Sequence, residues 1–78
     1  MVSRVLKVTK PLMRGDDVKT VQTALAAKDF NCGTDGTGGI YRAATAYAVR
    51  KFQAMNGLVV SGRVDRFAAQ KLGFVWKG

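Results

Sequence analysis

The 78-residue sequence contains no histidine and no glutamate, and its five acidic residues are all aspartates. Histidine is the usual general base near neutral pH and a common metal ligand, and glutamate supplies half of most glycosidase carboxylate pairs. The single cysteine, Cys32, cannot form an internal disulfide, and a catalytic thiolate would lack its usual histidine partner. We therefore expect no catalytic residue, no metal site and no cofactor in this chain.

Long apolar runs are absent as well. No stretch approaches the roughly 20 residues of a membrane-spanning helix, and no apolar segment of signal-peptide length follows Met1. The sequence thus predicts neither membrane insertion nor an export signal of its own. A chain of this length forms one small domain, residues 1–78, which buries about 60% of the surface that its unfolded form exposes.

Positive charge is what the sequence has in excess. The sequence contains thirteen lysines and arginines and only five acidic residues, which gives a formal net charge of +8 at pH 7. A field of this sign raises the rate of encounter with an anionic partner and is screened by salt. The alternative is that the charge only keeps the surface solvated, without a particular target.

The spacing of apolar residues predicts helices. Val18, Val21 and Leu25 fall on one face of a helix whose first turn Asp16 or Asp17 can cap. Similar spacing recurs twice further along the chain. The expected helices cover about residues 17–28, about residues 43–54, and the stretch between Asp65 and Gly73.

The connections between these helices are rich in glycine. Residues 29–39 contain four glycines and read as a structured loop, and Asn56-Gly57 is a helix stop signal. No run of residues supplies a convincing pair of strands. The predicted fold class is therefore all-α, a compact three-helix bundle with Gly-rich loops, preceded by an extended arm at residues 1–10 and followed by a tail at residues 74–78.

The chain also contains a weak internal repeat. Gly39 and Gly62 each precede a turn and then a helix, and Gln22 and Gln53 each follow an apolar residue late in a helix. A buried amide side chain needs hydrogen-bond partners, which loop backbone usually supplies. We expect one small module to be used twice, with Gln22, Gln53 and Thr45 in structural roles.

An ordered series of motifs within residues 4–73 resembles the small peptidoglycan-binding domain found beside cell-wall hydrolases. The motifs that carry this resemblance are Met13-Arg14-Gly15-Asp16-Asp17-Val18, Val21-Gln22, Gly39-Ile40-Tyr41, Ala48-Val49-Arg50-Lys51-Phe52-Gln53 and Gly57-Leu58. The sequence departs from the family in Asp29, where a helix-ending glycine is common, and in Gly38-Gly39, where Asp-Gly is usual.

The resemblance implies a three-helix, non-catalytic module that holds a separate amidase, peptidase or glycosidase on bacterial peptidoglycan. The partners would be the glycan strand or its stem peptide and a covalently linked catalytic domain in the parent chain, with the module itself a monomer. The versions attached to bacteriophage endolysins and related amidases look most similar. The place of action would be the bacterial cell wall or the extracellular space, reached by export that another protein provides, for example a phage holin.

Six residues are candidates for binding this ligand: Thr34, Asp35, Tyr41, Arg42, Arg50 and Arg63. The arginines, together with Lys51 and Arg66, could form one basic rim. Tyr41 could stack on a sugar, or it could belong to the core because the family usually has an apolar residue there. Thr34 and Asp35 could hydrogen-bond hydroxyls or stem-peptide amides, and Trp76 could stack on a sugar or cover an apolar patch.

Two other functions rank below this one. A basic nucleic-acid-binding module would explain the charge, but no helix-turn-helix motif or aromatic–basic platform is visible. A pro-segment of a metallopeptidase would resemble the same domain type. Such segments reach the metal with a cysteine near the C-terminal end of the domain, whereas Cys32 lies in the first long loop.

Overall fold

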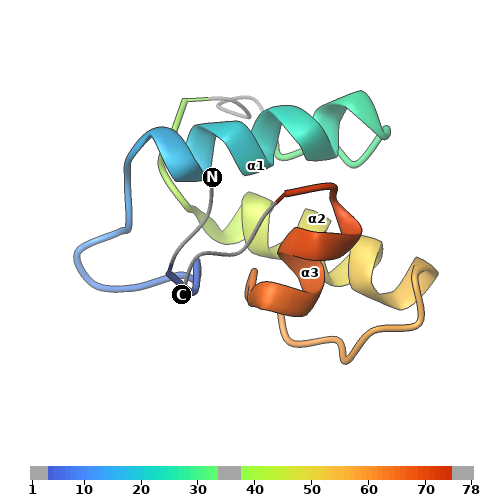
Figure 1. Cartoon of the computed structure of the whole chain (residues 1–78). Coiled ribbons are helices and arrows are strands. Elements are labelled where there is room, and N and C mark those ends of the chain that lie inside the picture. The colour runs from blue at the N-terminus through green and yellow to red at the C-terminus, as the bar shows by residue number, and fades with distance from the viewer. Residues whose placement is uncertain (1–3, 34–37, 75–78) are drawn as a thin grey trace.

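The computed structural model describes residues 4–33 and 38–74 and confirms an all-α fold. The helices are α1 (Asp16–Ala27), α2 (Ala43–Met55) and α3 (Arg66–Lys71), within a residue or so of the predicted bounds. The described residues form no strand, only two isolated antiparallel bridges, Leu6 with Val64 and Arg14 with Ile40. Figure 1 shows the N-terminal segment (blue) curving toward the start of α1, and the loop after α2 leading into α3.

The core forms where the apolar faces of the three helices meet. Val18, Val21 and Leu25 of α1 are fully buried, as their spacing predicts. The buried residues from α2, α3 and the intervening loops complete one cluster: Leu6, Cys32, Tyr41, Ala46, Ala48, Val49, Phe52, Val64, Ala68, Ala69 and Leu72.

All three helices end in the same backbone motif. A residue with positive φ follows each helix, and the amide after it donates to the carbonyl five residues back, which is the Schellman arrangement. A partly buried hydrophobic residue at that last position packs on the core each time. The positive-φ residues are Asp29, Gly57 and Gly73, and the closing bonds run from Phe30 to Leu25 (2.8 Å), Leu58 to Gln53 (2.9 Å) and Phe74 to Ala69 (2.9 Å).

The helix starts differ from one another. Asp65 caps α3 as predicted, because its Oδ1 accepts a hydrogen bond from the Ala68 amide at 3.0 Å. Asp17 accepts from the first-turn amide of Val18 at 2.9 Å, but it lies inside α1. The N-cap of α1 is Gly15, which has no side chain to donate or accept.

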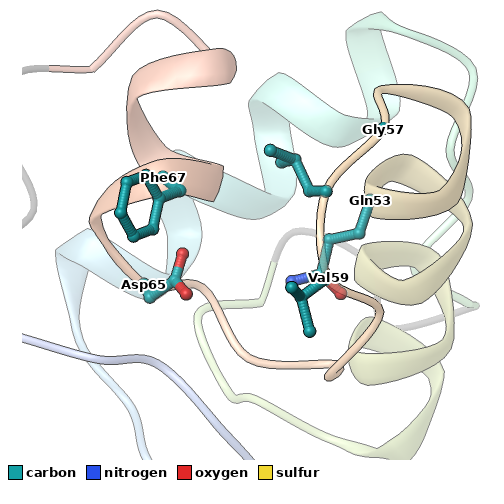
Figure 2. A pocket seen from close by; sticks show the side chains of 6 residues that line it. Gln53, Gly57, Val59, Asp65 and Phe67 are labelled. Carbon is teal, nitrogen blue, oxygen red and sulfur yellow. The ribbon is translucent and has the colours of Figure 1, made fainter.

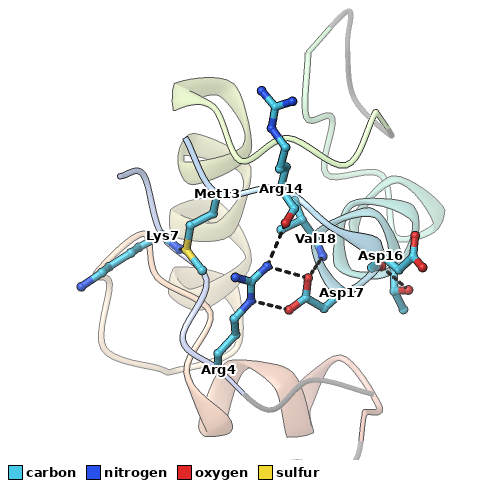
Figure 3. Close-up of polar contacts among 8 residues, drawn as sticks. Arg4, Lys7, Met13, Arg14, Asp16, Asp17 and Val18 are labelled. Atoms are coloured by element: carbon cyan, nitrogen blue, oxygen red, sulfur yellow. Dashed lines mark hydrogen bonds and ion pairs between the residues drawn. The ribbon is translucent and has the colours of Figure 1, made fainter. Parts of the chain in front are cut away.

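An ion pair fastens the N-terminal arm to the start of α1 (Figure 3). Arg4 Nε donates to Asp17 Oδ2 at 2.7 Å, and Arg4 Nη2 donates to the Arg14 carbonyl at 2.9 Å. Leu6 then exchanges two backbone hydrogen bonds with Val64, at 3.1 and 2.8 Å, and is fully buried. The extended arm is therefore packed into the core, and this fixes the lysines that follow Leu6 beside the loop that precedes α3.

Candidate functional site: a basic groove built on a glutamine-anchored loop

Gln53 of α2 holds the loop that precedes α3. Its side chain is 1% exposed. The oxygen Oε1 accepts from the amides of Ser61 and Gly62, both at 3.0 Å, and Nε2 donates to the Arg63 carbonyl at 2.9 Å. Because one amide group satisfies two backbone donors and a backbone acceptor, the loop backbone is fixed, with the side chains of Ser61 and Arg63 exposed.

Gln22 of α1 does the same for the loop that precedes α2. Its Oε1 accepts from the Gly39 amide at 2.9 Å, and its Nε2 donates to the Ile40 carbonyl at 2.8 Å and to Thr45 Oγ1 at 2.9 Å. The expectation that loop backbone satisfies both glutamines is confirmed. The internal repeat seen in the sequence thus corresponds to a repeated structural unit. In each copy, a glutamine of a helix hydrogen-bonds to the backbone of a glycine-containing loop.

Tyr41 joins the two loops through the core. Its side chain is fully buried, its hydroxyl donates to the Gly62 carbonyl at 2.7 Å, and its amide donates to the Met13 carbonyl at 2.8 Å. Burial raises the pKa of the phenol, which therefore stays protonated and able to donate. This position fits the alternative in which Tyr41 belongs to the core. It does not fit stacking on a sugar, because neither face of the ring is exposed.

A groove of about 470 Å³ lies between the N-terminal arm and the Gln53-anchored loop. We call it the basic groove, because four cations line it and no acidic residue does so among those described: Lys7 and Lys10 from the arm, Arg50 from α2, and Arg63 from the loop. Arg50 lies directly against Gly62, where an added Cβ would come within 3.0 Å of Arg50 Nη1. Gly62 also has φ +76°, so this close approach favours glycine twice over.

The groove therefore has the chemistry of an anion site. A guanidinium presents a planar fork that matches the two oxygens of a carboxylate or phosphate, and an ammonium adds a point charge. Two arginines and two lysines line this groove, and no acidic residue does so among those described. The arrangement can bind and orient an anion.

The structure unites some of the predicted site residues and separates others. Arg50 and Arg63 share the basic groove, whereas Arg42 is exposed at the N-cap of α2 and does not line it. Lys51 and Arg66 do not line it either. They lie over aromatic rings, Lys51 at 4.9 Å from the centroid of Tyr47 and Arg66 at 5.1 Å from that of Phe67. The candidates Thr34, Asp35 and Trp76 lie outside the described residues.

Sequence reasoning missed two of the four cations of this groove, Lys7 and Lys10. The arm showed only partial alternation of apolar and polar residues, which gave no sign that Leu6 would pair with Val64. That pairing places Lys7 at the groove, and Lys10 lines it from further along the arm.

A second hollow, of about 450 Å³, lies between the end of α2 and the start of α3 (Figure 2). Leu58, Val59 and Phe67 make it mainly apolar, and Val59 is 85% exposed. Its one acidic residue, Asp65, is engaged in capping α3. This hollow offers apolar contact without a group that would select an anion.

Cys32 belongs to the core. It is 5% exposed, and burial raises the pKa of its thiol, so the thiolate is disfavoured. This position does not suit a cysteine that must reach a metal in another domain. Among residues 4–33 and 38–74, no group of three or more His, Cys, Asp or Glu side chains could hold a metal ion, and no helix there is long and apolar enough to cross a membrane.

Comparisons with known proteins give the family. The model of the family described as "Putative peptidoglycan binding domain" matches residues 14–72. The chain is 48% identical over 60 residues to the N-acetylmuramoyl-L-alanine amidase XlyB of Bacillus subtilis (strain 168), covering 72% of this chain and 19% of that protein. It is 42% identical over 64 residues to the amidase CwlL of Bacillus licheniformis, covering 77% of this chain and 18% of CwlL.

Solved structures share the fold. The SleB N-terminal domain superposes with a TM-score of 0.81 at 28% identity, covering 92% of both chains. A fused Zn-dependent amidase/peptidase/peptidoglycan-binding domain protein from Clostridium acetobutylicum ATCC 824 gives a TM-score of 0.74 at 24% identity, over 96% of this chain and 31% of that one. The chain spans about a fifth of the amidases named above, which carry their catalytic domain elsewhere. On its sequence match and its three-helix fold, this chain belongs to the peptidoglycan-binding domain family and is a binding module rather than an enzyme.

Proposed function

We propose that this module holds its parent protein on the bacterial cell wall by taking carboxylates of the peptidoglycan stem peptide into the basic groove. The observation that carries the proposal is that Lys7, Lys10, Arg50 and Arg63 line one groove, which no acidic residue lines among those described. Stem-peptide carboxylates recur along the polymer, so a site for one of them meets many targets.

The strength expected of such a site is modest. Each exposed ion pair contributes about 0.2–1 kcal/mol, and the contribution falls as salt rises. Modest affinity suffices for a tethered module, because a linker keeps the enzyme at high effective concentration near a repeating ligand. Attachment would then weaken as ionic strength rises, and it would not require one particular position in the wall.

The proposal extends to the rest of the parent protein. The relatives are N-acetylmuramoyl-L-alanine amidases, so we propose that an amidase domain is covalently linked to this module and acts on the wall outside the cytoplasm. An endolysin-type parent, exported with the help of another protein, fits this role. We propose that the module itself works as a monomer, since a single chain supplies every cation of the groove.

Cosedimentation with purified sacculi tests the function. The folded domain is mixed with sacculi freed of teichoic acid, and the bound fraction is measured at low and high salt, with circular dichroism as the check on folding. The Arg50→Gln/Arg63→Gln variant should bind about tenfold more weakly, as expected for two lost ion pairs.

The matched control is Lys28→Gln/Lys71→Gln, which removes the same charge from exposed positions outside the groove. It should bind like the wild type. If the folded wild-type domain stays in the supernatant at low salt, or if the two double variants lose binding equally, the proposal fails. Tighter, steeply salt-dependent binding to random duplex DNA would favour the nucleic-acid alternative instead.

A further inference from the structure

We propose that the Gln22-anchored loop forms a second, weaker carboxylate subsite, so that one domain engages two stem-peptide carboxylates of peptidoglycan at once. This inference rests on the proposed function of the basic groove. It starts from a surface groove of about 400 Å³, here called the α1 groove, which Arg14, Lys19, Gly39 and Ile40 help to line.

The two grooves are built on the same plan. Lys19 lies three residues before Gln22, as Arg50 lies three residues before Gln53. Each cation flanks the glycine whose amide donates to the glutamine of its own helix. A Cβ added to Gly39 would lie 3.5 Å from Lys19 Cβ, and one added to Gly62 would lie 3.3 Å from Arg50 Cγ.

The N-terminal segment completes both grooves in a similar way. An antiparallel bridge joins Leu6 to Val64 beside the basic groove, and a second bridge joins Arg14 to Ile40 in the α1 groove. The first bridge places Lys7 at its groove, and the second places Arg14. In each groove, therefore, a helix cation and a cation from the N-terminal segment flank a glycine loop held by a buried glutamine.

The differences between the two grooves predict which of them has the higher affinity for a carboxylate. The α1 groove has two cations and one aspartate, Asp16, whereas the basic groove has four cations and no acid. Ile40 also occupies the place that corresponds to Arg63. One carboxylate beside an apolar group suits the α1 groove, and it should bind there more weakly than in the basic groove.

The spacing of the two grooves is fixed by the core. Tyr41 follows Ile40, its amide donates to the Met13 carbonyl next to Arg14, and its hydroxyl donates to Gly62 in the other groove. A rigid pair of subsites gains from a polymer that presents carboxylates at intervals, because the first contact raises the effective concentration for the second.

Two-dimensional ¹H–¹⁵N NMR can resolve the two subsites. The probe is a soluble disaccharide–tetrapeptide from peptidoglycan. The amides of residues 38–40 and of residues 61–63 should both shift, with the second group saturating at lower concentration. Lys19→Gln should weaken the first response and leave the second intact, and it should lower retention on teichoic-acid-free sacculi roughly twofold to fivefold.

Lys28→Gln is the control, since it removes the same charge near the end of the same helix, outside both grooves. It should change neither the shifts nor the retention. A response of residues 61–63 alone, with Lys19→Gln and Lys28→Gln behaving alike, overturns the second subsite while leaving the basic groove standing. A loss of retention by Lys19→Gln seen only on sacculi that carry teichoic acid overturns the carboxylate assignment, and a response of neither loop counts against the proposed function itself.

Discussion

Replacing Gln53 with leucine tests whether a buried amide holds the loop that carries the basic groove. The variant keeps a side chain of similar size and removes every bond to Ser61, Gly62 and Arg63. Gly62 is buried, so its amide loses its partner without regaining water, at a cost of about 1–3 kcal/mol. Ser61 and Arg63 are exposed and rehydrate, which limits the loss to about 1 kcal/mol for each bond.

We expect a total destabilisation of about 2–4 kcal/mol, since burial of leucine offsets part of the loss. A domain of this size has about 4–12 kcal/mol of stability, so the effect is large. Urea unfolding monitored by circular dichroism measures it as a fall in the transition midpoint. Gln70→Leu is the control, because Gln70 is exposed on α3. A Gln53→Leu variant within about 0.5 kcal/mol of the wild type would refute the reasoning.

Three further predictions concern single contacts. Tyr41→Phe removes the buried hydroxyl that donates to Gly62 and should lower the free energy of unfolding by about 1–2 kcal/mol; an unchanged urea midpoint would contradict this. Asp29→Gly should raise the melting temperature, with a gain of about 1 kcal/mol, because Asp29 has φ +68° at a helix end where glycine carries no Cβ penalty; a lower melting temperature would show that the aspartate side chain matters. Arg4 donates hydrogen bonds to Asp17 and thereby holds the pKa of that carboxyl below its usual 3.8, so the contribution of the pair is complete at neutral pH and is lost as pH falls through the folded-state pKa. Asp17→Asn should therefore cost about 1 kcal/mol at pH 7, and urea titrations of the variant and the wild type should converge below about pH 4; a constant difference at all pH values would speak against the ion pair.

Local sequence patterns predicted the helices because the signals that define them are local. The i, i+3, i+7 spacing of Val18, Val21 and Leu25 matches the buried face of α1. The stop signal at Gly57 and the cap at Asp65 also act within a few residues of their own positions. None of these features depends on contacts with distant parts of the chain.

The groove was only partly predictable, because it depends on contacts between distant segments. Arg50 and Arg63 were expected on one rim, and the bonds from Gln53 to the loop bring them together. Lys51 was expected there too, but it is one position further along α2, and that step of about 100° turns it toward Tyr47. Lys7 depends on the pairing of Leu6 with Val64, which no local pattern encodes.

The direct test of the central claim is the retention of the folded wild-type domain on teichoic-acid-free sacculi before and after their carboxylates are converted to amides. Four cations in one groove predict salt-sensitive retention on untreated sacculi and a loss of most of it after amidation. Equal retention on both preparations would contradict the claim that the basic groove recognises stem-peptide carboxylates.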